Sequence, residues 1–350
     1  MSDDLFEEGG PLNVRRTGSD EYEMSISIPK DDDGMIGREC PKEDCSPGYF
    51  KIKPGTGITE NQEIAFCPYC RFEAEPSDFT TQAQKDYAIA LVQNNAINSL
   101  DRMLKKTLGL NSVGKRKIGA GLFSIEMSLK SGRPDYVPRP IEEELQRDIV
   151  CPNCGLEHSV FGLATWCADC GQDIFLIHVD KEFQVIEKML SVFDKRREEL
   201  GARVAGRDIE NAIEDMVSIF EAVMKSITSR HLLQQGNQPG EIADILEKQI
   251  RNQYQNIKSA QEVFKKFIGI ELFDGLSGQS LETLTLIFEK RHPITHNLGV
   301  VDRKYLARVR SGELQGREIN VSSQEVFDVI EIIRLVISSA YRRANMLKDV

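Results

Sequence analysis

The sequence predicts a protein of α-helices with a small β content, in which two small cysteine-built modules joined by a long helix precede an all-α helical bundle. Three observations support this. The eight cysteines form four close pairs, all before residue 171. Residues 78–108 carry one apolar stripe at helical spacing. After residue 180, apolar residues recur at steps of three and four, which is typical of packed amphipathic helices.

Length and charge limit the class of protein. A chain of 350 residues is long enough for two or three domains. No apolar run reaches the roughly 20 residues of a membrane span, and the acidic N-terminus does not resemble a signal peptide. We therefore expect a cytoplasmic protein without membrane contact. The net charge is -11, but residues 1–35 alone carry ten acidic and three basic residues, so an anionic ligand elsewhere is permitted.

The cysteine pairs predict two metal sites. Three pairs have the x2 spacing of a zinc knuckle with Pro or Gly beside them, and the first pair has four intervening residues. Disulfides are the alternative, which the redox poise of the cytosol disfavours. We expect two closed, structural zinc ions with no catalytic role. His158 and His178 lie close enough to substitute as ligands, but with four cysteines in each site we expect them to be ordinary surface or core histidines. The ligands are Cys40, Cys45, Cys67 and Cys70 in the first site and Cys151, Cys154, Cys167 and Cys170 in the second.

Both modules resemble zinc ribbons, which bind nucleic acid or proteins, so a protein partner is also possible there. Strands are expected at 22–28, 49–52, 64–66, 123–130, 160–161 and 174–177. The expected boundaries are 1–35 for an acidic tail and first strand, 36–77 for the first ribbon, 78–110 for the connecting helix, 111–179 for the second ribbon and 180–350 for the helical bundle. The connecting helix should start at Ser77 or Asp78, and Lys115, Arg116 and Lys117 should lie in a loop after it.

The bundle is predicted from its periodicity. Apolar positions mark helices over 183–193, 209–227, 242–267 and 281–288, and Ser322-x-x-Glu325 has the form of a capping box that opens the last helix. Pro293 disfavours helical geometry at the residue before it, so the helix through Phe288 should end or kink there.

Polar residues gather at that proline, in the sequence Arg291-His292-Pro293-Ile294-Thr295-His296-Asn297. On a regular helix, residues five apart lie about 140° apart, so Arg291 and His296 would share a cleft only if the helix is broken. An ordinary polar turn between helices is the alternative interpretation, because Arg and His at this spacing often occur by chance.

An all-helical C-terminal region with Arg291, the polar His292, three variable residues and His296 resembles the HEPN (higher eukaryote and prokaryote nucleotide-binding) family over about half of the chain. Asn297 and Gly299 follow the motif, as is frequent in similar sequences. One branch of the family carries a tyrosine two residues after the histidine, and Leu298 stands there instead.

The resemblance implies a metal-independent endoribonuclease, in which a ribose 2'-hydroxyl attacks the adjacent phosphate. His296 would move the proton and Arg291 would bind the negative charge of the phosphorane. His292 and Asn297 are auxiliary candidates for orienting the phosphate. One such pair supplies a single proton-transfer group, and HEPN-like domains commonly form symmetric dimers, so we expect a homodimer through the bundle.

The leading hypothesis is therefore a nuclease that acts on RNA, as in a toxin or antiviral defence effector. A second is a non-catalytic protein that binds RNA or a nucleotide with the same pair. A third is a regulator built around its zinc ribbons, which the bundle only dimerises.

Overall fold

The structure is a computed structural model that describes residues 9, 12–18, 21–111, 113–119, 125–129, 137–139, 147–309 and 312–346. The chain divides into two compact units, residues 1–173 and 174–350. Helices make up most of the regular structure, with a few small sheets, and the second unit is helical throughout its regular part, as expected. None of the described helices combines the length and the apolar character that crossing a membrane requires.

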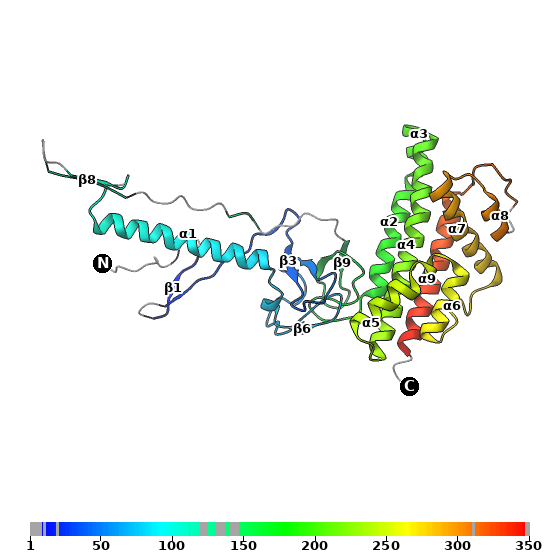
Figure 1. Cartoon of the computed structure of the whole chain (residues 1–350), viewed down its shortest axis with the longest axis horizontal. Coiled ribbons are helices and arrows are strands. Elements are labelled where there is room, and N and C mark those ends of the chain that lie inside the picture. Colours follow the sequence, from blue (N-terminus) through cyan, green and yellow to red (C-terminus); the bar gives the residue numbers. More distant parts are fainter. Residues whose placement is uncertain are drawn as a thin grey trace. The chain divides into compact units, whose positions relative to one another are not determined.

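The first unit contains the strands and one long helix (Figure 1). Its elements are β1 (Arg15–Arg16), β2 (Tyr22–Glu23), β3 (Ile36–Glu39), β4 (Tyr49–Ile52), β5 (Ala65–Phe66), β6 (Glu73–Ala74), the 3-10 turn η1 (Pro76–Phe79), α1 (Gln82–Thr107), β7 (Lys115–Ile118), β8 (Ile125–Ser128), β9 (Arg147–Val150) and β10 (Glu157–Val160). The main sheet has four antiparallel strands in the order β3-β4-β10-β9.

This strand order corrects the expectation of two separate ribbons over 36–77 and 111–179. Strand β4 comes from the first cysteine segment and pairs with β10 from the second, with Ile52 opposite His158 and Phe50 opposite Val160. Each segment alone contributes only two four-residue strands to this sheet, and a two-stranded hairpin is marginal in water. Pairing β4 with β10 gives both hairpins a partner and builds one module.

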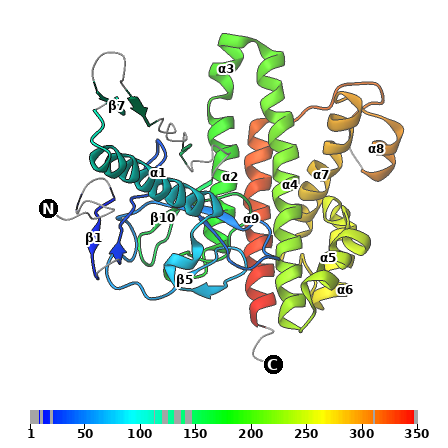
Figure 2. The same ribbon diagram turned by 60° about the vertical axis from the view of Figure 1, so that its left-hand side comes forward.

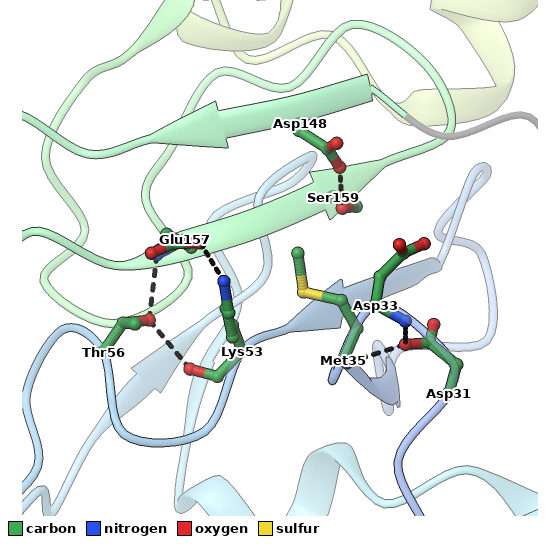
Figure 3. A network of polar contacts seen from close by, with 8 residues as sticks. All are labelled: Asp31, Asp33, Met35, Lys53, Thr56, Asp148, Glu157 and Ser159. Atoms are coloured by element: carbon green, nitrogen blue, oxygen red, sulfur yellow. Dashed lines mark hydrogen bonds and ion pairs between the residues drawn. The ribbon is translucent and has the colours of Figure 1, made fainter.

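Polar side chains reinforce the join between the two segments (Figure 3). Lys53 Nζ lies 2.6 Å from Glu157 Oε2, and the Glu157 amide donates to Thr56 Oγ1 at 3.0 Å. Thr56 Oγ1 in turn donates to the Lys53 carbonyl at 2.8 Å. The figure also shows Asp31 accepting from the Met35 amide, at 2.7 Å, which closes the turn before β3.

Several expected elements of this unit differ. Of the strand over 22–28, only Tyr22–Glu23 pairs, with β1. Helix α1 starts later than expected because residues 76–79 form a 3-10 turn. Thr81 is the N-terminal cap of α1 and forms a capping box with Gln84. The basic residues 115–117 lie in β7, not in a loop, and β7 pairs with β8 and not with the main sheet. Phe123, Ser124 and Lys130 of the expected strand lie outside the described residues.

The second unit is a helical bundle, whose elements are α2 (Phe175–Ser191), α3 (Phe193–Leu200), α4 (Ala202–Gln234), α5 (Pro239–Asp244), the π-helical turn η2 (Ile245–Ile250), the 3-10 turn η3 (Gln253–Gln255), α6 (Ile257–Ile268), α7 (Gly278–Asn297), α8 (Arg303–Arg308) and α9 (Ser323–Met346). The 33-residue α4 packs against α2, α7 and α9, and Figure 2 shows α2, α9 and α4 side by side. Phe220 of α4 meets Phe288 of α7 edge to face, with ring centroids 5.3 Å apart.

Three expectations for the bundle are corrected. Residues 174–177 were expected as a strand, but α2 begins at Phe175. The helix expected over 242–267 is broken into α5, η2, η3 and α6, with Arg251 at a φ of 50°. Helix α7 does not end at Pro293: it runs on to Asn297, and the capping residue Leu298 is left-handed. A proline removes one amide, and the packing of buried Pro293 and Ile294 keeps the last turn helical.

Candidate functional site

The eight cysteines form the two groups that their spacing predicts. Within each group the ligand sulfurs all lie within 4.8 Å of one another. The Sγ to Sγ distances include 3.7 Å for Cys40 and Cys70, 3.6 Å for Cys45 and Cys67, 3.7 Å for Cys151 and Cys170, and 3.5 Å for Cys154 and Cys167.

These distances fit a metal ion and exclude disulfides. Four sulfurs placed tetrahedrally about 2.3 Å from a zinc ion lie about 3.8 Å apart, whereas a disulfide requires about 2 Å. All eight cysteines are free thiols. Burial raises the pKa of Cys154 to about 11, so four thiolates at one point need a cation to balance them. Each group could therefore hold one metal ion.

Three of the cysteine pairs share one backbone turn. The Cys67 amide donates to the Phe72 carbonyl at 2.9 Å, Cys151 to Leu156 at 2.9 Å and Cys167 to Gln172 at 2.8 Å. The residue after the second cysteine has a positive φ in each case: Arg71 (61°), Gly155 (77°) and Gly171 (63°). Glycine at two of these positions allows the turn to be predicted from the sequence, whereas Arg71 has a positive φ although it is not a glycine.

Backbone hydrogen bonds join the segments that carry the two four-cysteine groups. The amide of Phe66 donates to the carbonyl of Ala168 at 2.7 Å, and the amide of Thr165 donates to the carbonyl of Pro68 at 2.8 Å. Asp169, between the last two cysteines, is buried and accepts from the Ile58 amide at 3.0 Å. Burial raises the pKa of this carboxyl group, with hydrogen bonds from Ile58 and Gln62 and the charge of Arg38 acting against it.

The candidate catalytic residues lie on α7, and the structure places Arg291 against η3. Its Nη1 donates to Gln255 Oε1 at 2.7 Å, and Gln255 donates to Glu221 Oε2 at 2.5 Å. Among the described residues the buried Nε of Arg291 has no hydrogen-bond partner. The guanidinium is thus half-buried and held by one neutral acceptor.

The structure brings the two histidines of this segment together. His292 is half-buried, His296 is exposed, and their ring centroids lie 5.0 Å apart at an angle of 58°. Asn297, the other auxiliary candidate, donates to the Val300 carbonyl at 2.7 Å and so closes the helix end. Thr295 Oγ1 donates to Glu214 Oε1 at 2.9 Å.

The structure shows no comparable contact between Arg291 and His296 among the described residues. No hydrogen bond joins them in the described part of the chain. Because α7 remains helical through Pro293, they keep the separation of about 140° around the helix that five residues impose. His292 and His296, four residues apart, lie on one face.

Sequence reasoning missed two buried charges beside this site, both on α7. Glu289 is 8% exposed and accepts from Asn256 Nδ2 at 2.7 Å. Lys290 is 4% exposed and donates to the Asn320 carbonyl at 2.8 Å, with carboxylates of Glu313 and Glu325 both at 3.6 Å. The available signal was the unbroken charged run 289–291 directly after an apolar stretch.

A groove of about 610 Å³ lies beside the end of α7. Ile294 and Gly299 line it, together with the start of α4, residues 318–321 and two arginines, Arg197 and Arg203. The Arg203 guanidinium forms an ion pair with Glu210, which also lines the groove.

No family model, curated protein or solved structure matches this chain.

Proposed function

We propose that this protein is a metal-independent endoribonuclease of the HEPN type, which uses Arg291 and His296 of α7 and carries two structural zinc ions in its cysteine centres. The observation that carries the proposal is the exposure of His296 at the end of α7, with the His292 ring 5.0 Å away. An RNA phosphate can reach this imidazole from solvent.

The chemistry suits the residue types. Attack by a 2'-hydroxyl group requires removal of its proton, and the departing 5' oxygen requires a proton in return. His296 takes one of these roles, and general acid–base catalysis contributes about 10²–10⁴-fold in rate. The second proton-transfer group is His292 or a histidine of a second copy of the chain.

Arg291 stabilises the phosphorane in this proposal. In the described conformation it donates to the neutral amide of Gln255. A phosphate oxygen is a charged acceptor and competes well with an amide, and the planar guanidinium can donate to it with two parallel bonds. Substrate binding thus requires this side chain to exchange Gln255 for phosphate.

A homodimer through the bundle supports the same chemistry. Leu298, two residues after His296, is 79% exposed at the end of α7, where a second copy of the chain would cover it. A two-fold interface would bring two copies of the α7 end together. The groove lined by Arg197 and Arg203 offers RNA a path to this end.

Zinc is the ion that four thiolates at these distances favour, and closed four-cysteine sites are structural. We assign the zinc-bound unit the recognition of RNA or of a protein partner. An RNA-cleaving protein of this kind would act in the cytoplasm as a toxin or antiviral defence effector.

The test is cleavage of a labelled RNA by the zinc-loaded full chain, with EDTA added at mixing and zinc content measured before and after. We expect cleavage by the wild type and a loss of about 10²-fold or more in Arg291→Ala and His296→Asn. Arg291→Lys should also fail because it lacks the planar fork. Arg303→Ala, an exposed arginine of α8, is the matched control and should cleave normally. Intact activity in both site variants would overturn the assignment.

A second candidate is a non-catalytic RNA- or nucleotide-binding protein. The hydrogen bond between Arg291 and Gln255 favours it, because the described residues show no hydrogen bond between Arg291 and His296. Retention of RNA without cut ends, weakened in Arg291→Ala, would select this function.

A further inference from the structure

His292 and His296 present two imidazole rings on one face of α7, four residues apart. This is a separate feature from the cysteine centres, and it belongs to a different unit of the chain. The ring centroids are 5.0 Å apart. Two imidazoles that bind one zinc ion through nitrogens about 2.0–2.1 Å from it, at a tetrahedral angle, have centroids about 5 Å apart. The observed centroid spacing is therefore compatible with a bidentate chelate.

Two sources of negative charge lie near His296. His296 lies in the last turn of α7, where the helix dipole places partial negative charge. Its neighbour Thr295 is bonded to the carboxylate of Glu214, which places a negative charge close to the same turn. Because His296 is exposed, an ion can enter with its remaining water ligands.

The helix that carries the pair is held on both sides. Lys290 anchors α7 to the Asn320 carbonyl, and Thr295 anchors it to α4 through Glu214. Pro293, between the two histidines, is buried and restricts the backbone. Chelation therefore requires little ordering of the backbone, and the remaining cost is the choice of side-chain rotamers.

We propose that His292 and His296 together bind one late first-row divalent ion, of the zinc, nickel or copper class, in addition to the two ions of the cysteine centres. Imidazole nitrogens select these borderline ions over magnesium and calcium, which prefer oxygen ligands. Two protein ligands leave open positions for water, so binding is reversible and weaker than in a closed four-cysteine site.

The consequence for activity rests on the proposed ribonuclease function. An imidazole nitrogen that coordinates a metal ion holds its lone pair in that bond and cannot accept the proton of a 2'-hydroxyl group. The bound ion thus inhibits cleavage, and its removal restores cleavage. The histidine pair would thus make a metal-independent reaction sensitive to inhibition by metal ions.

The binding test uses nickel alone, without RNA. The full chain is first loaded with zinc and freed of excess, and its zinc content is measured. It is then titrated with Ni²⁺ by calorimetry, with bound nickel and retained zinc counted by mass spectrometry. We expect one nickel per chain with the zinc content unchanged, and loss of the nickel in both His292→Gln and His296→Gln. The matched control is His231→Gln, a histidine of α4 outside the pair, which should keep the nickel.

Absence of a nickel-binding event in the wild type, or its persistence in both variants, overturns the inference. Displacement of zinc by nickel in place of an added ion also overturns it. In a second arm, nickel should block RNA cleavage and EDTA should restore it. If RNA is not cleaved at all, the ribonuclease proposal fails, and the number of bound nickel ions still tests the histidine chelate. If RNA is cleaved but no nickel binds, only the chelate proposal fails.

Discussion

The amide of Phe66 donates to the carbonyl of Ala168 at 2.7 Å, across a separation of about 100 residues in the sequence. Phe66 directly precedes a ligand of the first cysteine centre, and Ala168 lies between two ligands of the second. With the bonds from Thr165 and Trp166 to the Pro68 carbonyl, the two knuckles form one hydrogen-bonded structure.

We therefore predict that the two metal centres load together. Cys167→Ser removes a ligand of the second centre only, yet it should lower the metal content from two ions per chain to fewer than one. The reason is that the collapsed knuckle no longer supports residues 66–68. Mass spectrometry under native conditions measures this directly. Retention of one full ion per chain would show that the centres are independent.

Gly57 and Gly55 offer a matched pair for the contact between the segments. Both have a positive φ, of 73° and 93°. A Cβ at Gly57 would collide with Asp169 Oδ2 and come 2.9 Å from Leu156 Cβ, whereas a Cβ at Gly55 meets nothing within 4 Å. Both alanine variants lose about 1 kcal/mol to backbone strain. Gly57→Ala should lose about 1–3 kcal/mol more through overpacking, measured by urea unfolding. Equal losses would contradict this contact.

His231 should make the stability of the helical unit depend on pH. Burial lowers the pKa of this histidine, so the folded state favours its neutral form. The stabilisation is complete above the unfolded pKa of about 6.5 and is lost as pH falls from there through the lower folded pKa. Thermal unfolding between pH 7.5 and 5 should show this decline, and it should be shallower in His231→Gln. The same slope in the variant would assign the decline to other groups.

Lys290 should be among the costliest lysines to remove. Its Nζ is buried beside the carboxylates of Glu313 and Glu325 and donates to the Asn320 carbonyl. Lys290→Ala leaves these acceptors without their cation, and we expect a loss of about 3 kcal/mol in the free energy of unfolding. The control is Lys304→Ala on the exposed side of α8, which should change it by about 0.5 kcal/mol or less. Similar losses of unfolding free energy in both variants would show that the buried contacts of Lys290 do not stabilise the fold.

Local signals predicted local structure well. The spacing of the cysteines predicted both metal-binding groups, because ligands in a knuckle are set by the few residues between them. The capping box at the last helix is confirmed: the Ser322 amide donates to Glu325 at 2.8 Å, and the Glu325 amide donates to Ser322 Oγ at 3.2 Å. Apolar periodicity likewise located α4 and α9, whose buried faces follow the expected steps.

Expectations that depended on contacts between residues far apart in the sequence were less accurate. The helix expected over 242–267 is interrupted at Arg251, where the sequence has no proline or glycine that would predict a break. Ile250 and Tyr254, on either side of Arg251, are both buried. The helix was expected to end or kink at Pro293, and the structure shows that it does not end there: α7 continues to Asn297, with Pro293 and Ile294 buried. That continuity directs Arg291 toward Gln255 and pairs His296 with His292.

The sequence by itself determined which cysteines gather into two groups and the helical nature of the second half, because each depends on spacings of a few residues along the chain. Only the tertiary structure decided that the two cysteine segments share one sheet and which side chains on α7 meet. Strand pairing and side-chain direction depend on surfaces contributed by segments far apart in the sequence, and no local pattern carries that information.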